Sequence, residues 1–246
     1  AGQDDLVSAF LNGDDVYISM SSRIYTKLEE GVTKDERFVG KTTILGCGYG
    51  MGAVKFVEQL ATFGHVMSID EGRRVVNVYR EANWKIVQLW RDLQQMLVKM
   101  SRGETMSLGP NGIIRSVETA TGMGILLPSG LVMRYDALEF EQGKYGPEFS
   151  YKTRRGRTRI YGGKLCENVC QAIARCIMGE QMLAIAKKHK VALTVHDSVV
   201  CCVPTATLDQ SQAFIESCMR VTPSWAEGLP ITCESDSGKS YGEAAG

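Results

Sequence analysis

The chain has 246 residues, of which 44% are hydrophobic and 23% charged, and its formal net charge at pH 7 is +0. This is an ordinary globular composition, and the zero net charge argues against a protein that binds nucleic acid through its overall charge. No apolar run approaches the roughly 18 residues that a membrane helix needs, and no charged-then-apolar signal segment opens the chain. We therefore expect a soluble, cytoplasmic protein with one large domain or two small ones.

Helical patterns dominate the first hundred residues. Asp4-Asp5 precedes apolar residues at helical spacing that Gly13 stops, and Asp14-Asp15 opens a second amphipathic segment. A third segment begins at Lys34, and later segments keep the same spacing of apolar residues. These patterns predict helices at about 4–12, 15–25, 34–50, 53–63 and 71–100.

The pattern changes near Ser107, where glycine, proline and asparagine mark turns between short β-rich runs at 125–127 and 131–135. Residues 164–188 are again helical in pattern and lead directly into a β-rich hairpin at 191–203. A last helix at 209–219 and a short strand at 231–233 complete the chain. A helical part, 1–106, followed by a mixed part, 107–246, indicates an α+β fold.

The eight cysteines include no Cys-x-x-Cys pair. Cys166, Cys170 and Cys176 lie in the helical segment, and no second ligand pair has the usual zinc spacing. Small buried residues are therefore favoured over a zinc site, and a reducing compartment follows.

The segment from Lys152 to Arg159 carries five cations in eight residues. Such a run is either a solvated loop or a patch that contacts phosphates. The segment alone does not decide between these interpretations.

The predicted hairpin is interrupted by His196, Asp197 and Ser198, which separate two apolar, β-branched runs. Aspartate and serine are common turn residues, so a purely structural tip is one interpretation. An aspartate held by two strands is also a good ligand for a divalent cation.

A second pattern lies in the segment RFVGKTTILGCGYG, where Arg37, Lys41, Leu45 and Tyr49 recur every four residues. On a helix they would line one face over roughly 18 Å. Two cations, an apolar side chain and an aromatic ring follow the order of a nucleoside triphosphate from phosphates to base. Three glycines in the same segment weaken the helix and suggest a close approach there. The alternative is a solvated basic stripe.

Together these segments resemble the family A DNA polymerases, especially those of phages. Arg37-x3-Lys41-x7-Tyr49-Gly50 is similar to motif B on the fingers O helix, and VHDS at 195–198 is similar to motif C in the palm. YGGKLCENVCQAIAR, LLPSG and the first 17 residues resemble further stretches of the phage branch. The resemblance implies a partial right-hand fold, with helical fingers at 1–106 and a palm portion with antiparallel sheet at 107–246.

The resemblance implies roles for the residues of motif B. Arg37 and Lys41 would bind the β and γ phosphates of the incoming dNTP, and Lys41 would also donate a proton to pyrophosphate. Tyr49 would stack beside the template base. Leu45 occupies the position where an aromatic ring usually packs on the sugar, and Tyr17 the position of a phosphate-contacting histidine.

It also implies a metal site and DNA contacts. Asp197 would ligate the two Mg²⁺ ions of a two-metal mechanism, and His196 would position the primer terminus. Gln171 and Asn168 would contact the minor groove of the primer-template. In a DNA-binding protein the basic segment would act as the phosphate-contacting patch, through Arg154 and Arg155. Ser198 replaces the usual glutamate of motif C.

The segment carrying motif A, with the second metal-binding aspartate, is expected about a dozen residues before Ala1. Two-metal catalysis needs carboxylates from both motifs, so we expect a DNA polymerase that is inactive without a second polypeptide supplying motif A, the thumb and perhaps a proofreading exonuclease. If the protein is phage-encoded, it would act in the cytoplasm of the bacterial host. The alternative is a non-catalytic DNA-binding accessory subunit that retains the polymerase scaffold.

Overall fold

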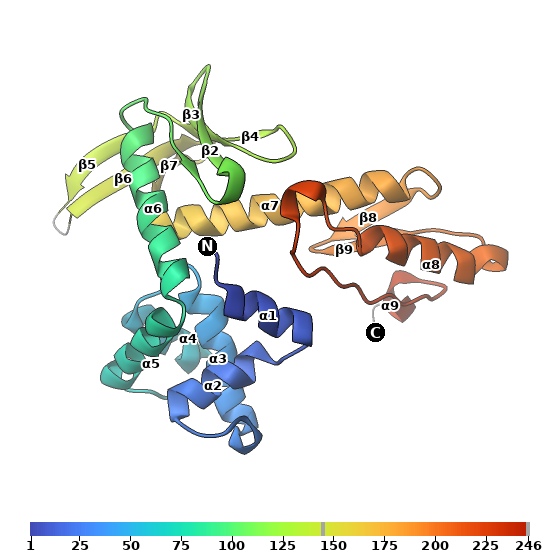
Figure 1. Cartoon of the computed structure of the whole chain (residues 1–246), viewed down its shortest axis with the longest axis horizontal. Helices are drawn as coiled ribbons and strands as arrows, with labels where there is room; N and C mark the ends of the chain where they lie inside the picture. The colour runs from blue at the N-terminus through green and yellow to red at the C-terminus, as the bar shows by residue number, and fades with distance from the viewer. Residues whose placement is uncertain (144–145, 245–246) are drawn as a thin grey trace. The chain divides into compact units, whose positions relative to one another are not determined.

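The computed structural model describes residues 1–143 and 146–244 and divides the chain into two compact units, Ala1–Cys170 and Gln171–Gly246. The combination of helices and antiparallel sheets confirms the α+β prediction (Figure 1). None of the described helices is both long and apolar enough to span a bilayer. The division between fingers and palm at residue 106 stays a prediction.

Six α-helices open the first unit, and three of them begin at a side chain that caps the helix. Asp15 caps the second helix through its carboxylate, and Thr33 and Ser68 each form a capping box with a glutamate three residues later. The six helices are α1 (Asp4–Asn12), α2 (Val16–Tyr25), α3 (Lys34–Cys47), α4 (Ala53–Thr62), α5 (Ile69–Ala82) and α6 (Trp84–Met100).

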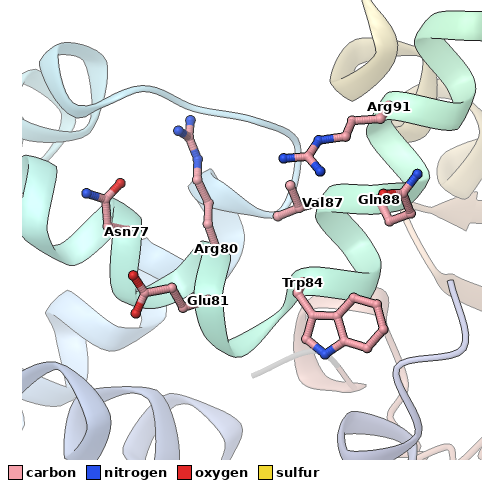
Figure 2. Close-up of a pocket in the computed structure, with 7 residues that line it drawn as sticks. All are labelled: Asn77, Arg80, Glu81, Trp84, Val87, Gln88 and Arg91. Carbon is pink, nitrogen blue, oxygen red and sulfur yellow. The ribbon is translucent and has the colours of Figure 1, made fainter.

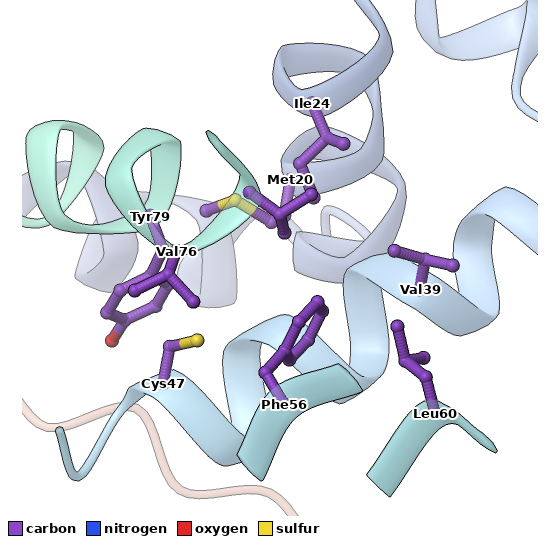
Figure 3. Packing of buried hydrophobic residues seen from close by; sticks show 9 residues of the cluster. Met20, Ile24, Val39, Cys47, Phe56, Leu60, Val76 and Tyr79 are labelled. Atoms are coloured by element: carbon purple, nitrogen blue, oxygen red, sulfur yellow. The ribbon is translucent and has the colours of Figure 1, made fainter. Parts of the chain in front are cut away.

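The core of this helical part lies among α2, α3, α4 and α5 (Figure 3). Phe56 and Leu60 of α4 are completely buried, and each such side chain stabilises the fold by about 1.5 to 3 kcal/mol. The other members of the cluster are Met20, Ile24, Val39, Cys47, Val75, Val76 and Tyr79.

The predicted helix at 71–100 is wrong in one respect, because α5 and α6 are separate helices that meet at Asn83. The backbone of Asn83 has φ −112° and ψ 44°, outside the helical range, and its buried side chain donates a hydrogen bond to the Tyr79 carbonyl. Neither glycine nor proline marks this break, so the hydrophobic pattern runs through it.

Two antiparallel sheets follow in the first unit, each a simple meander. The four-stranded sheet has the order β1-β2-β3-β4 and the three-stranded sheet the order β5-β6-β7. The strands are β1 (Ser107–Leu108), β2 (Ile114–Thr119), β3 (Gly122–Leu126), β4 (Val132–Asp136), β5 (Glu139–Gly143), β6 (Gly146–Thr153) and β7 (Gly156–Ile160).

Helix α7 (Gly162–Ile185) contains the boundary between the units. The second unit continues with the hairpin β8 (Val191–Val195) and β9 (Ser198–Cys201), then α8 (Leu208–Met219) and the short α9 (Tyr241–Ala244). Buried Gln181 donates a hydrogen bond to the carbonyl of Met219 at 2.6 Å and so holds the end of α8. The strand predicted at 231–233 is wrong, since these residues form no strand.

Candidate functional site

Three residues of the predicted dNTP site lie together at the contact between α2 and α3. The Arg37 guanidinium carbon lies 5.3 Å from the centre of the Tyr17 ring, and the Lys41 ammonium nitrogen lies 6.0 Å from it. The exposed Lys41 forms no ion pair within the described part of the chain. The three residues therefore form a compact cationic cluster around one aromatic ring.

Asp15 is a member of this cluster that sequence analysis missed. Arg37 donates from Nε to Asp15 Oδ2 at 2.8 Å, and a terminal guanidinium nitrogen lies 2.7 Å from the same oxygen. The other carboxylate oxygen of Asp15 caps α2 by accepting from the backbone nitrogens of Tyr17 and Ile18. The capping position was visible in the sequence, but a partner 22 residues away was not.

Neighbouring groups stabilise the ionised form of the Asp15 carboxylate. Partial burial raises its pKa, but the hydrogen bonds from Arg37 and from the backbone of Ile18 and Tyr17 outweigh that effect, so the pKa lies below its ordinary value. Asp15 therefore remains ionised at neutral pH and offsets part of the charge of Arg37. Lys41 has no such counter-ion among the described residues and keeps its full attraction for an anion.

The cluster depends on the close approach of α2 and α3 at Gly40. A Cβ atom at this position would collide with the Ser21 hydroxyl and the Tyr17 carbonyl. The buried Ser21 hydroxyl lies 2.8 Å from the Tyr17 carbonyl oxygen and 2.7 Å from that of Glu36, so it ties the two helices together. Glycine at position 40 is what allows Tyr17 to face Arg37 and Lys41.

Tyr49 does not lie on the same helix face as Arg37 and Lys41, contrary to the prediction, because α3 ends at Cys47 and not near residue 50. Gly48 and Gly50 place Tyr49 in a turn, and Gly50 adopts a left-handed φ of 86° that ends the helix. Leu45 stays on α3 with 54% of its side chain exposed. Half-buried Tyr49 has a raised pKa, mainly because of burial.

The start of α7 packs tightly on this turn. A Cβ atom at Gly162 would collide with the Trp90 carbonyl, and one at Gly163 would collide with the Tyr49 carbonyl. The Gly162 backbone nitrogen also donates to the Gln94 side chain at 2.7 Å. The two adjacent glycines thus allow the first turn of α7 to contact two other segments of the first unit.

Asn168 and Gln171, the predicted minor-groove residues, both lie on α7. The Asn168 amide nitrogen donates to the Tyr135 hydroxyl at 3.1 Å, and burial raises the pKa of that tyrosine. Asn168 is therefore partly committed to holding α7 on the four-stranded sheet. Gln171 is exposed on the same helix.

The basic segment is not a loop but the hairpin of β6 and β7. Arg157 pairs with Glu139 at 3.0 Å, and Arg159 pairs with Glu148 at 3.1 Å, so these two cations stabilise the sheet surface. Arg154 and Arg155 form the exposed turn between Thr153 and Gly156. Neither is ion-paired with another described residue, which leaves these two arginines available for an anionic partner.

The predicted hairpin is present in the second unit but is shorter than 191–203. Ser198 belongs to β9 and pairs with Val195, so the turn contains only His196 and Asp197. His196 adopts a left-handed φ of 53°, which is uncommon for a residue other than glycine. The tip therefore holds its two side chains in a fixed turn, with His196, Asp197 and Ser198 all exposed.

Asp197 is suited to one part of a magnesium site. Its carboxylate has no hydrogen-bond or ion-pair partner among the described residues, and carboxylate oxygen is a preferred ligand of Mg²⁺. Across residues 1–143 and 146–244, no group of three or more His, Cys, Asp or Glu side chains could hold a metal ion. At the hairpin tip the described residues thus supply one carboxylate that fits a magnesium ion, and not a complete set of ligands.

Comparison with known proteins gives a relative in sequence and one in fold. No protein-family model matches the chain. It is 28% identical over 245 residues to the DNA polymerase of Bacillus phage SP02, across 95% of this chain and 37% of that polymerase. It is also similar to the POL domain of Pol1 from M. smegmatis, whose structure was solved in complex with DNA primer-template and dNTP. That match has a TM-score of 0.62 and 17% identity over 98% of this chain and 36% of the other.

The chain therefore spans little more than a third of the length of either relative. The structural match shows the polymerase fold, and the sequence match connects the chain to a phage enzyme. The predicted resemblance to the family A DNA polymerases, in their phage branch, is confirmed.

Proposed function

We propose that this chain forms the nucleotide-binding region, and part of the catalytic region, of a DNA-directed DNA polymerase that adds dNTPs to a primer 3′ end. The observation that carries the proposal is the cluster of Arg37, Lys41 and Tyr17 in a chain related to a phage DNA polymerase over 95% of its length. Primer-template DNA and dNTPs, the ligands in the mycobacterial complex, are the proposed partners.

The cationic cluster supports a role in binding the triphosphate. Lys41 is exposed and without a carboxylate partner in the described structure, so a phosphate would meet its full charge. Arg37 would exchange its partly exposed contact with Asp15 for a phosphate, because an ion pair near the surface contributes only about 0 to 1 kcal/mol. Lys41 would then donate a proton to the leaving pyrophosphate, and Leu45 and Tyr49 would contact the sugar and the base.

At the hairpin tip, Asp197 would hold Mg²⁺ and His196 would position the primer terminus. Bound Mg²⁺ would supply charge stabilisation to the reacting phosphate and activate the primer hydroxyl. The two paired strands fix the backbone on either side of Asp197, which limits the freedom of its carboxylate. One carboxylate does not balance two divalent cations, so we expect further carboxylates from polypeptide outside these 246 residues, supplied by a second chain that carries motif A.

The DNA contacts in the proposal come from two places. Gln171 and the remaining carbonyl oxygen of Asn168 would contact the minor groove. Arg154 and Arg155, at the tip of the β6–β7 hairpin, would contact phosphates.

The test is primer extension by this chain mixed with a polypeptide that carries motif A. We expect Lys41→Ala to raise the KM for dNTP and lower kcat, with a combined loss of about 100-fold or more, typical of a lost transition-state contact. Lys55→Ala removes an exposed lysine from the neighbouring α4 and should leave both constants unchanged. Asp197→Asn should abolish extension without changing the melting temperature.

Two results would contradict the proposal. If Lys41→Ala abolishes primer-template binding while the KM for dNTP stays the same, the cluster binds DNA and not the nucleotide. If the mixture binds primer-template but extends nothing under any condition, the chain is an accessory subunit with a polymerase scaffold.

A further inference from the structure

A groove on the first unit, away from the predicted site residues, lies where α5 meets α6. Its volume is about 340 Å³, and Figure 2 shows its lining. All of the lining side chains except that of Val87 are exposed, so the groove is shallow and open. The lining residues are Asn77, Arg80, Glu81, Trp84, Val87, Gln88 and Arg91. We propose that this groove binds single-stranded DNA.

The break at Asn83 creates the groove. It separates the last turn of α5, with Arg80, from the first turn of α6, with Trp84. Besides the Asn83 contact with Tyr79, the side chain of Gln3 donates to the Ala82 carbonyl at 3.3 Å and so supports the junction. The groove is therefore held by buried polar contacts on its inner side.

Two arginines give the groove its affinity for phosphate. In Figure 2 the guanidinium groups of Arg80 and Arg91 lie on the same side of the junction, with Val87 between them. Neither is ion-paired with another described residue, whereas Arg73, which lies on α5 like Arg80, pairs with Asp70 at 2.5 Å. Glu81 is the only acidic residue of the lining, so the groove keeps a net positive charge of one. Guanidinium forks match phosphate oxygens well.

Trp84 gives the groove a surface on which a base can stack. Its side chain is 60% exposed, although a tryptophan is usually mostly buried. The Lys85 ammonium lies 5.9 Å from the ring centre, and Asp4, at 3.2 Å from it, offsets part of its charge. An exposed ring next to cations is how proteins bind single strands without sequence preference, because every base has a face that stacks.

The same features argue against other ligands. A duplex keeps its base faces stacked inside and offers none to Trp84. A free nucleotide needs a pocket that encloses most of its surface, and this lining is nearly all exposed. An acidic peptide would use the arginines but not the flat ring. The inference rests on the proposed function only in that the protein acts on DNA, since the groove involves neither dNTP nor Asp197.

The test is binding of a fluorescent oligo-dT to the full chain, without Mg²⁺ or dNTP, across a series of salt concentrations. Each arginine that contacts a phosphate should reduce the slope of log K against log salt by about 0.7. We expect this reduction for Arg80→Gln and for Arg91→Gln. Arg73→Gln, which removes the same charge from α5 outside the groove, should keep the wild-type slope. Trp84→Ala should weaken binding by about fivefold or more.

The melting temperature of each variant checks that it is folded. If Arg73→Gln and Arg80→Gln reduce the salt-dependence slope equally, the effect is one of general charge and the inference is overturned. Wild-type binding of oligo-dT by all three groove variants would also overturn it. If blunt duplex DNA or polyglutamate displaces the labelled oligo-dT as effectively as unlabelled oligo-dT does, the groove binds a different partner. The two proposals fail separately. If the mixture extends primers but the groove variants bind oligo-dT like the wild type, only the proposal for the groove is rejected. If the groove variants lose oligo-dT binding but the mixture extends no primer, only the proposed polymerase function is rejected.

Discussion

Replacing Gly40 by alanine should separate α2 from α3 and weaken the cationic cluster. The new methyl group would meet the Ser21 hydroxyl, the Tyr17 carbonyl and, at 3.2 Å, the Ser21 backbone nitrogen. Two of these three atoms belong to the backbone of α2 and cannot rotate away. The hydroxyl can do so only by giving up its contacts with the carbonyls of Tyr17 and Glu36.

The size of the effect follows from two opposing contributions. Overpacking of this kind costs about 1 to 3 kcal/mol, and alanine recovers about 0.5 to 1 kcal/mol over glycine inside a helix. Because two of the three overlapping atoms belong to the backbone, the upper half of the first range applies, about 2 to 3 kcal/mol. The net loss of unfolding free energy is therefore about 1 to 2.5 kcal/mol. For a chain of this length that corresponds to a fall in Tm of roughly 2 to 10 °C.

Gly46→Ala is the matched control, because it makes the same substitution on the same helix. The Cβ atom there would meet the tip of Met51, at 2.9 Å from its sulfur, and this flexible side chain can move. Urea and thermal unfolding, followed by tryptophan fluorescence, should show a clear loss for Gly40→Ala and almost none for Gly46→Ala. Equal stability of the two variants would refute the close contact of α2 and α3. In the extension assay, Gly40→Ala should also raise the KM for dNTP.

Two further predictions concern titrating groups. The Cys166 thiol donates a hydrogen bond to Cys170, and this contact lowers the pKa of the Cys170 thiol below its ordinary value. Iodoacetamide at pH 7.5 should therefore alkylate Cys170 faster than Cys202, both of which are exposed, and Cys166→Ala should slow the reaction at Cys170. Equal rates of alkylation, measured by peptide mass spectrometry, would contradict this. Because the folded-state pKa of Asp15 is depressed, its stabilising effect is present above pH 3.8 and is lost as the pH falls further. The difference in unfolding free energy between wild type and Asp15→Asn should therefore shrink below pH 3.8, and a difference that does not change with pH would exclude the ion pair with Arg37.

The sequence predicts best where the structure depends on neighbouring residues. The starts of α2 and α3 follow from side chains that cap within three residues, and the β8–β9 hairpin follows from two β-branched runs around a short turn. The resemblance to motif B led to Arg37 and Lys41, which the fold does bring to the same aromatic ring, that of Tyr17.

The failures come from contacts between distant residues. The strands β6 and β7 were not predicted, because the run of cations hid their pairing with glutamates on other strands of the sheet. Arg157 pairs with Glu139 of β5, and Arg159 pairs with Glu148 of β6. The break at Asn83 depends on a buried amide contact that no turn residue signals. The strand predicted at 231–233 has β-branched character but no strand beside it in the described structure.

The paired glycines at the start of α7 have a consequence for the detection of distant relatives. Any side chain at Gly162 or Gly163 would overlap a backbone carbonyl of another segment, and backbone atoms, unlike side chains, cannot be exchanged by compensating mutation. Amino-acid substitutions at these two positions should therefore accumulate far more slowly than at exposed neighbours such as Tyr161. A search profile that weights Tyr-Gly-Gly-Lys at its glycines, together with a downstream His-Asp hairpin, should recover diverged homologues that overall identity no longer reveals.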